Sequence, residues 1–153
     1  MEIKMLNPFL IRIAFYEGSD GPRLMVFGSL ESAFELIQKC FDELAECKEN
    51  CSIDLDQLPW VYASNGIKVR LTSCGYEPEA PISIAPNGIQ KTGIKPPAFE
   101  WKQANKGWKH LSHLTQGLLD SKTPCHQYLT TSSNEDVIVI LSKGEYTDEF
   151  LVS

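Results

Sequence analysis

Hydrophobic and polar positions follow several patterns along this chain, and each pattern predicts a different kind of secondary-structure element. Residues 137–141 form an unbroken aliphatic run with polar residues on both sides. A run of this length is typical of a strand buried on both faces, and it is too short to cross a membrane. We therefore predict a strand at 136–142 in the middle of a sheet, with 126–131 as its hairpin partner.

Turn residues and alternation predict further strands. Residues 10–16 and 24–27 are rich in β-formers, and the dense turn sequence at 17–22 predicts that they form a β-hairpin with a six-residue loop. Strict alternation in 67–71 predicts a half-exposed strand with its apolar residues inward and Lys68 and Arg70 outward. The short apolar segment at 61–62 is its candidate partner across a turn at 65–66.

Two segments have the apolar spacing of amphipathic helices. In the first, an apolar stripe predicts a helix over 30–48 with Ser29 as its N-cap; its members are Leu30, Phe34, Ile37, Phe41 and Leu44. In the second, the stripe predicts a helix over 100–120; its members are Trp101, Ala104, Trp108, Leu111, Thr115 and Leu118. Gly107 and Gly117 weaken the second helix, so packing must stabilise it.

Proline changes the character of the chain over 76–97, which holds five of the nine prolines. We predict an ordered loop or excursion there, with a short edge strand at 82–84. The whole pattern predicts a single α+β domain over 1–153. It would have a mostly antiparallel sheet of about five to six strands, two amphipathic helices and the order ββ-α-β(β)-α-ββ.

Composition places the protein among ordinary globular domains, with 42% hydrophobic and 22% charged residues. The first residues lack the basic opening and the apolar stretch of a signal peptide, so we expect a cytoplasmic protein that does not enter a membrane. Five cysteines fit that compartment as free thiols. The spacing of Cys40, Cys47 and Cys51 lacks the second ligand pair of a zinc site, so no metal is expected.

After the hydrophobic periodicity, the distribution of charge is the most informative property of the sequence. The net charge is −6, and residues 31–57 alone hold eight acids against Lys39 and Lys48. The segment 66–122 is mildly basic, and 123–153 is acidic again. Because phosphate neutralisation needs clustered Lys and Arg, this pattern disfavours nucleic-acid binding.

Motifs for catalysis are weak. Cys125 and His126 are adjacent, but neighbouring strand residues point to opposite faces, so the two side chains should not meet. His110 and His113 lie three apart without further metal ligands, and the pair Asp54 and Asp56 lacks the rest of a calcium loop. No phosphate-binding loop or nucleophile motif occurs. The sequence therefore favours a protein that is not an enzyme and has no cofactor.

The acidic segment carries the preferred hypothesis of function, which is binding of a basic protein partner. One concrete form is a cytoplasmic immunity or antitoxin-type inhibitor of a basic toxin. An enzyme or small-ligand-binding protein with a pocket under the 76–97 loop is the alternative. A subunit or adaptor whose acidic helix face only keeps it soluble is a third hypothesis. The expected partner-binding residues are Glu35, Asp42, Glu46, Glu49, Asp54, Asp56 and Trp60.

Overall fold

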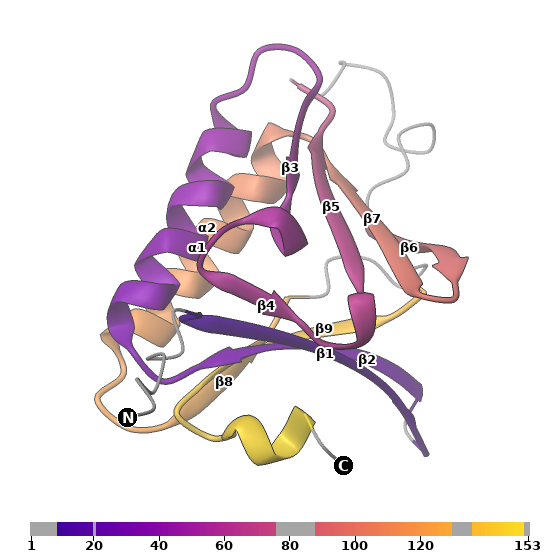
Figure 1. Ribbon diagram of the computed structural model, residues 1–153. Helices are drawn as coiled ribbons and strands as arrows, with labels where there is room; N and C mark the ends of the chain where they lie inside the picture. The colour runs from indigo at the N-terminus through magenta and orange to yellow at the C-terminus, as the bar shows by residue number, and fades with distance from the viewer. Residues whose placement is uncertain (1–8, 20, 76–87, 130–135, 152–153) are drawn as a thin grey trace, which may run out of the picture.

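The computed structural model describes residues 9–19, 21–75, 88–129 and 136–151, and in them the chain forms an α+β domain (Figure 1). The helices are α1 (Glu31–Ala45) and α2 (Asn105–Asp120). The strands are β1 (Ile11–Gly18), β2 (Gly21–Gly28), β3 (Cys51–Asp54), β4 (Val61–Ala63), β5 (Lys68–Ser73), β6 (Gly88–Ile94), β7 (Pro97–Gln103), β8 (Cys125–Tyr128) and β9 (Ile138–Lys143). Short 3-10 helices are η1 (Leu55–Gln57), η2 (Ser64–Gly66) and η4 (Asp148–Leu151). The predicted fold class is confirmed.

The strands divide into two mixed sheets, where the sequence suggested one. The five-stranded sheet has the order β4-β1-β2-β9-β8, and the four-stranded sheet has the order β3-β5-β7-β6. Neighbouring strands are antiparallel in β1–β2, β3–β5, β6–β7 and β8–β9, and parallel in β1–β4, β2–β9 and β5–β7. In Figure 1 the two helices lie side by side, next to the four-stranded sheet and above the five-stranded one.

Both predicted hairpins are confirmed, with different bounds. Strands β1 and β2 remain paired as far as Gly18 and Gly21, so only two residues separate them, and the six-residue loop is wrong. Strand β9 lies between β2 and β8, which gives it a neighbour on each side, although β2 is the central strand. Val139 is fully buried and Ile140 nearly so, whereas Ile138, at the start of the strand, is only half-buried.

Helix α1 buries the predicted stripe, but it does not begin with the predicted cap. Leu30 occupies the N-cap position, and no side chain there bonds to the first turn. The buried residues of α1 fall at the predicted helical spacing and face both sheets; they are Ala33, Phe34, Ile37, Cys40, Phe41 and Leu44. Tertiary packing of this stripe therefore determines where the helix lies.

The second predicted helix begins too early. Residues 97–103 form strand β7, in which Phe99, Trp101 and Gln103 are buried at alternate positions. Trp101 lies seven residues before Trp108, a separation that suits two turns of helix, and this made it look helical. The parallel neighbour β5 and the antiparallel neighbour β6 satisfy the backbone of this segment as a strand, so α2 starts only at Asn105.

Two further predictions about the middle of the chain need correction. The 76–97 loop is in part a strand, because 88–94 form β6; residues 76–87, with the expected strand at 82–84, lie outside the described residues. Strand β4 pairs with β1 and not with 67–71, because β5 already has β3 and β7 as neighbours. The alternation in that segment is confirmed: Val69 and Leu71 are buried, and Lys68 and Arg70 are exposed.

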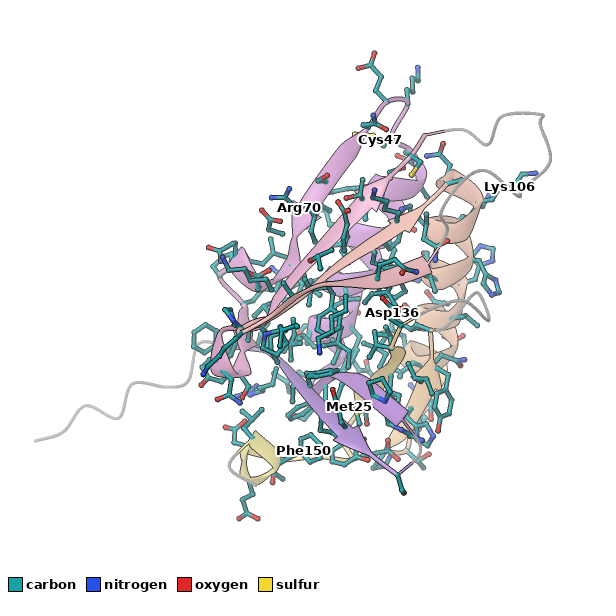
Figure 2. The ribbon with its side chains drawn as sticks, turned by 90° about the vertical axis from the view of Figure 1, so that its right-hand side faces the viewer. Met25, Cys47, Arg70, Lys106, Asp136 and Phe150 are labelled. Atoms are coloured by element: carbon teal, nitrogen blue, oxygen red, sulfur yellow. A yellow bond between two sulfur atoms is a disulfide. The ribbon has the colours of Figure 1, made fainter. Side chains whose placement is uncertain are left out.

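The core has two parts, one on each face of the five-stranded sheet. The main cluster joins both helices and both sheets, with Trp108 fully buried at its centre. The smaller cluster lies on the opposite face of the five-stranded sheet, where Met25, Phe27 and Ile140 pack against Phe150 of η4. Figure 2 shows Phe150 in the C-terminal turn beneath this sheet, with Met25 above it.

The prediction that all five cysteines are free thiols is wrong. Cys47 and Cys51 form a disulfide between the end of α1 and the start of β3, visible beside Cys47 in Figure 2. Their Cα atoms lie 6.3 Å apart, within the span that a disulfide requires. Cys40, Cys74 and Cys125 are free. Cys47, inside the predicted helix, and Cys51, just beyond it, thus meet across the turn that follows α1.

The three free thiols should differ sharply in reactivity. Burial, together with the charge of Glu43, raises the pKa of the Cys40 thiol to about 11, so its reactive thiolate is scarce. Cys74 is exposed. In native protein at neutral pH, iodoacetamide should modify Cys74 first and Cys40 only after unfolding, as measured by peptide mass spectrometry. Equal labelling of Cys74 and Cys40 in the native state would contradict the placement of α1.

Candidate functional site

The exposed side of α1 and the turn after it carry a run of carboxylates. We call it the α1 acidic surface; it consists of Glu31, Glu35, Asp42, Glu43, Glu46 and Glu49, all of them exposed. The apolar stripe of α1 faces the main core, so the helix can only present these residues outward. Four of the predicted partner-binding residues therefore belong to one surface: Glu35, Asp42, Glu46 and Glu49.

These six carboxylates differ from most other acids of the described chain because they form no ion pairs within it. Among the described residues none of the six forms an ion pair, and Asp42 alone has a side-chain partner, the Ser112 hydroxyl of α2. Most acids elsewhere in the described chain are engaged by a cation or a hydrogen-bond donor: Glu17, Asp54, Asp56, Glu100, Asp120, Asp136, Glu145 and Asp148. Unmatched negative charge is thus concentrated on α1.

Helix electrostatics make part of this arrangement unfavourable for the isolated protein, although the exposed Lys39, four residues from both Glu35 and Glu43, offsets some of the repulsion. Glu31 and Glu35 form a like-charge pair four residues apart, as do Asp42 and Glu46, and each such pair costs a few tenths of a kcal/mol. Glu31 in the first turn suits the helix dipole, but the last turn of α1 has no basic residue. Acids near that end, where cations are favoured, add to the cost.

Helix α2 limits the acidic surface on one side. Gln38 of α1 donates to the Ser112 carbonyl at 3.1 Å and to the Gln116 side chain at 3.0 Å, so the two helices are in direct contact. The exposed side of α2 carries cations and histidines, namely Lys106, Lys109, His110 and His113. The negative surface is therefore confined to α1 and its following turn.

The structure places Asp54 and Asp56 away from this surface. Asp54 forms an ion pair with Arg70 at 2.8 Å, and the hydrogen bond from Arg70 lowers the pKa of Asp54. Asp56 accepts the Val69 N–H at 2.9 Å and so ties η1 to β5. Both carboxylates line the outer face of the four-stranded sheet, and neither is unmatched. They belong to a different feature of the molecule.

Trp60 is not the exposed anchor that the sequence suggested. Its side chain is half-buried against the main core, and its carbonyl accepts the N–H groups of Leu10 and Ile11. The more exposed aromatic side chains among the described residues are Tyr62, Tyr128 and Tyr146. The neighbouring Pro59 indicates an irregular segment, but packing against the main core, which local sequence does not reveal, covers part of the Trp60 side chain.

A hollow of about 610 Å³ lies over the outer face of the four-stranded sheet. Small residues leave space there: β7 has Ala98, which is paired with Gly93 of β6. Charged and polar side chains of both signs surround it, namely Asp54, Asp56, Gln57, Lys68, Arg70, Thr92 and Glu100. Thr92 is the one lining residue that comes from 88–97.

Cys125 and His126 point to opposite faces of β8 and do not form a catalytic pair. The Cys125 thiol lies 3.9 Å from the Leu118 carbonyl, whereas the imidazole Nδ1 of His126 lies 3.0 Å from Glu145. Burial raises the pKa of Glu145, but hydrogen bonds from Ser142 and His126 outweigh it and lower that pKa overall. The Ser142 hydroxyl donates to Glu145 at 2.6 Å and not to His126, so these side chains lack the order serine, histidine, carboxylate of a catalytic triad.

Other classes of site find little support. Within the described ranges, no group of three His, Cys, Asp or Glu side chains lies close enough to hold a metal ion. Neither of the helices that the structure describes is long and apolar enough to span a bilayer. Comparisons with protein-family models, with curated proteins and with solved structures find no match for this chain.

Proposed function

We propose that this protein is a non-enzymatic binding module whose α1 acidic surface takes up a basic partner protein. A cationic toxin blocked by an immunity or antitoxin-type inhibitor is the concrete form of this proposal. The observation that supports it is the contrast between α1, whose carboxylates have no ion pair among the described residues, and the matched acids elsewhere. Lys and Arg side chains of a partner would supply the missing positive charge.

The rigidity of α1 also favours binding. The Asn105 side chain donates to the Leu44 carbonyl at 3.1 Å and to the Cys47 carbonyl at 2.8 Å, which fixes the end of the helix. The disulfide from Cys47 to Cys51 fixes the turn that follows. Carboxylates on such a scaffold are already arranged before binding, so association orders little of the backbone.

Charge reversal on α1 tests the proposal. In a double variant, Glu35→Lys and Glu46→Lys, we expect loss of a basic protein that the wild type captures from the source cells, as measured by quantitative mass spectrometry. The matched control reverses two acids outside α1, Glu17→Lys and Glu149→Lys, and so makes the same change in net charge. We expect the control to retain the partner, because a local surface and not the total charge would bind it.

Two results would contradict the proposal. Equal capture by the α1 variant and by the wild type would show that the surface is only solvated. Equal loss in the α1 variant and in the control would show that net charge alone governs retention. Circular dichroism of both variants confirms that neither change unfolds the protein, since all four positions are exposed.

A second candidate function is binding of a small polar ligand in the hollow over the four-stranded sheet. Its support is the volume of about 610 Å³ and the convergence of carboxylates with Lys68 and Arg70, which could hold a ligand that carries both charges. Thermal stabilisation by such a ligand, abolished in Arg70→Ala and unchanged by the α1 variant, would favour this function over the first.

A further inference from the structure

The outer edge of β6 is closed by Asp136, the residue two positions before β9. The Ile89 carbonyl accepts the Asp136 N–H at 3.1 Å, and the Lys91 N–H donates to the Asp136 carboxylate at 2.9 Å. These backbone groups point away from β7, so Asp136 occupies the place that a neighbouring strand would take. Figure 2 shows Asp136 beside the four-stranded sheet. This edge of the four-stranded sheet is therefore blocked against further strands.

Strand β8, at the edge of the five-stranded sheet, has no comparable closure. The Leu129 N–H donates to the Val139 carbonyl at 2.9 Å. Hydrogen-bonded pairs alternate along an antiparallel ladder, so the backbone N–H and C=O groups of Gln127 and Cys125 also point toward β9. His126 and Tyr128 must then direct their N–H and C=O groups to the open side. Within the described chain, only the Tyr128 carbonyl of these groups has a partner, the Gln127 side chain at 3.2 Å.

The side chains of β8 do not protect this edge either. Protected edges are short or carry lysine, proline or a bulge; β8 is short, with four residues, but it has no lysine, proline or bulge. Tyr128 is 46% exposed, and its ring lies against that of His126 with 5.6 Å between the centroids. The positive charge that His126 can carry already faces Glu145 of its own chain. An incoming strand would therefore meet two aromatic rings, with the Glu145 carboxylate already paired to one of them.

We propose that β8 pairs antiparallel with β8 of a second copy of this chain, about a two-fold axis at Gln127. In this register the outward backbone groups of His126 meet those of Tyr128 of the second copy, and the reverse pair forms at the same time. Each imidazole then lies opposite a phenol ring, and no like charges face each other. The inference is independent of the α1 acidic surface, since it uses none of its residues.

A cysteine at the proposed axis tests the register directly. Two Gln127 residues would form a non-hydrogen-bonded pair with Cα atoms about 4.5 Å apart, a distance that a disulfide can span. We expect Gln127→Cys to form a cross-linked dimer on mild oxidation, with the bridge mapped to this position by mass spectrometry. Wild type gives the background from native thiols. Gln116→Cys, at an exposed position of α2, is the matched control. A bridge no more abundant than in these controls would overturn the proposal.

A backbone change tests the hydrogen bonds. Tyr128→Pro removes an N–H that faces the open edge, so it breaks no bond within the chain, whereas Tyr128→Phe keeps that N–H. Light scattering after size exclusion should show dimers for wild type and Tyr128→Phe, and monomers for Tyr128→Pro. A monomeric wild type at every concentration would overturn the proposal, even if β8 captured a strand from another protein. If Tyr128→Pro does not fold, the cross-link decides the outcome.

Discussion

Replacing Trp108 with alanine is expected to lower the free energy of unfolding by about 3–5 kcal/mol. Trp108 is fully buried, stacks on Phe41 with 5.7 Å between ring centroids, and contacts Trp101 at 5.5 Å. Its indole N–H donates to the Thr72 carbonyl at 3.1 Å. The substitution would thus open a cavity where α1, α2 and both strands β5 and β7 meet, and would leave a carbonyl without its donor.

Urea denaturation followed by circular dichroism measures this loss. Tyr62→Ala is the control, because Tyr62 is exposed and its removal should cost less than about 1 kcal/mol. If Trp108→Ala destabilised the protein no more than Tyr62→Ala, then Trp108 would not be the centre of the main core.

Ile140→Ala should cost about 2–5 kcal/mol on the other face of the five-stranded sheet. Ile140 is 4% exposed and packs with Met25 and Phe27 under the C-terminal turn. The same denaturation experiment on Ile138→Ala is the matched control: this neighbour on β9 is half-buried, so its loss should be smaller. Equal losses at Ile138 and Ile140 would contradict the burial pattern of β9.

Elements with a single clear hydrophobic periodicity could be predicted from the sequence. The stripe of α1 has a single period over its whole length, and the β1–β2 hairpin joins β-formers through a short turn. Where a helical and a strand periodicity overlap, the predicted element was wrong. Trp101 fits both the alternation of β7 and the spacing of α2, and only the neighbours β5 and β6 decide between them. Pairing of β4 with β1 is likewise invisible in local sequence.

Some residues of the candidate site could likewise be predicted from the sequence, and others could not. Glu35, Asp42 and Glu46 could be predicted to share a surface because one helix fixes their spacing. Asp54 and Asp56 could not be assigned, since their partners Arg70 and Val69 come from β5, a strand that follows later in the chain. Such long-range pairing determines which acids remain unmatched, and sequence alone does not reveal it.

The same limit applies to the cysteines and to the sheet edges. The helix predicted over 30–48 contains Cys47, but α1 ends at Ala45, and the chain turns back into β3, which begins at Cys51. Asp136 was expected only as the start of a strand, and it also closes the edge of β6, which lies in the other sheet. Both features depend on where an element ends, which is the least certain part of a sequence-based prediction.

The dependence of the association rate on salt tests the proposed role of α1 most directly. Attraction between exposed charges is screened over about 8 Å at physiological ionic strength and over about 30 Å at 0.01 M. With the captured basic partner, the wild-type rate constant should fall steeply as salt rises. The variant with Glu35→Lys and Glu46→Lys should associate at least about tenfold more slowly at low salt, and the two rates should converge at high salt. Rate constants that match at low salt would contradict the account, because α1 would then be only a solvated helix.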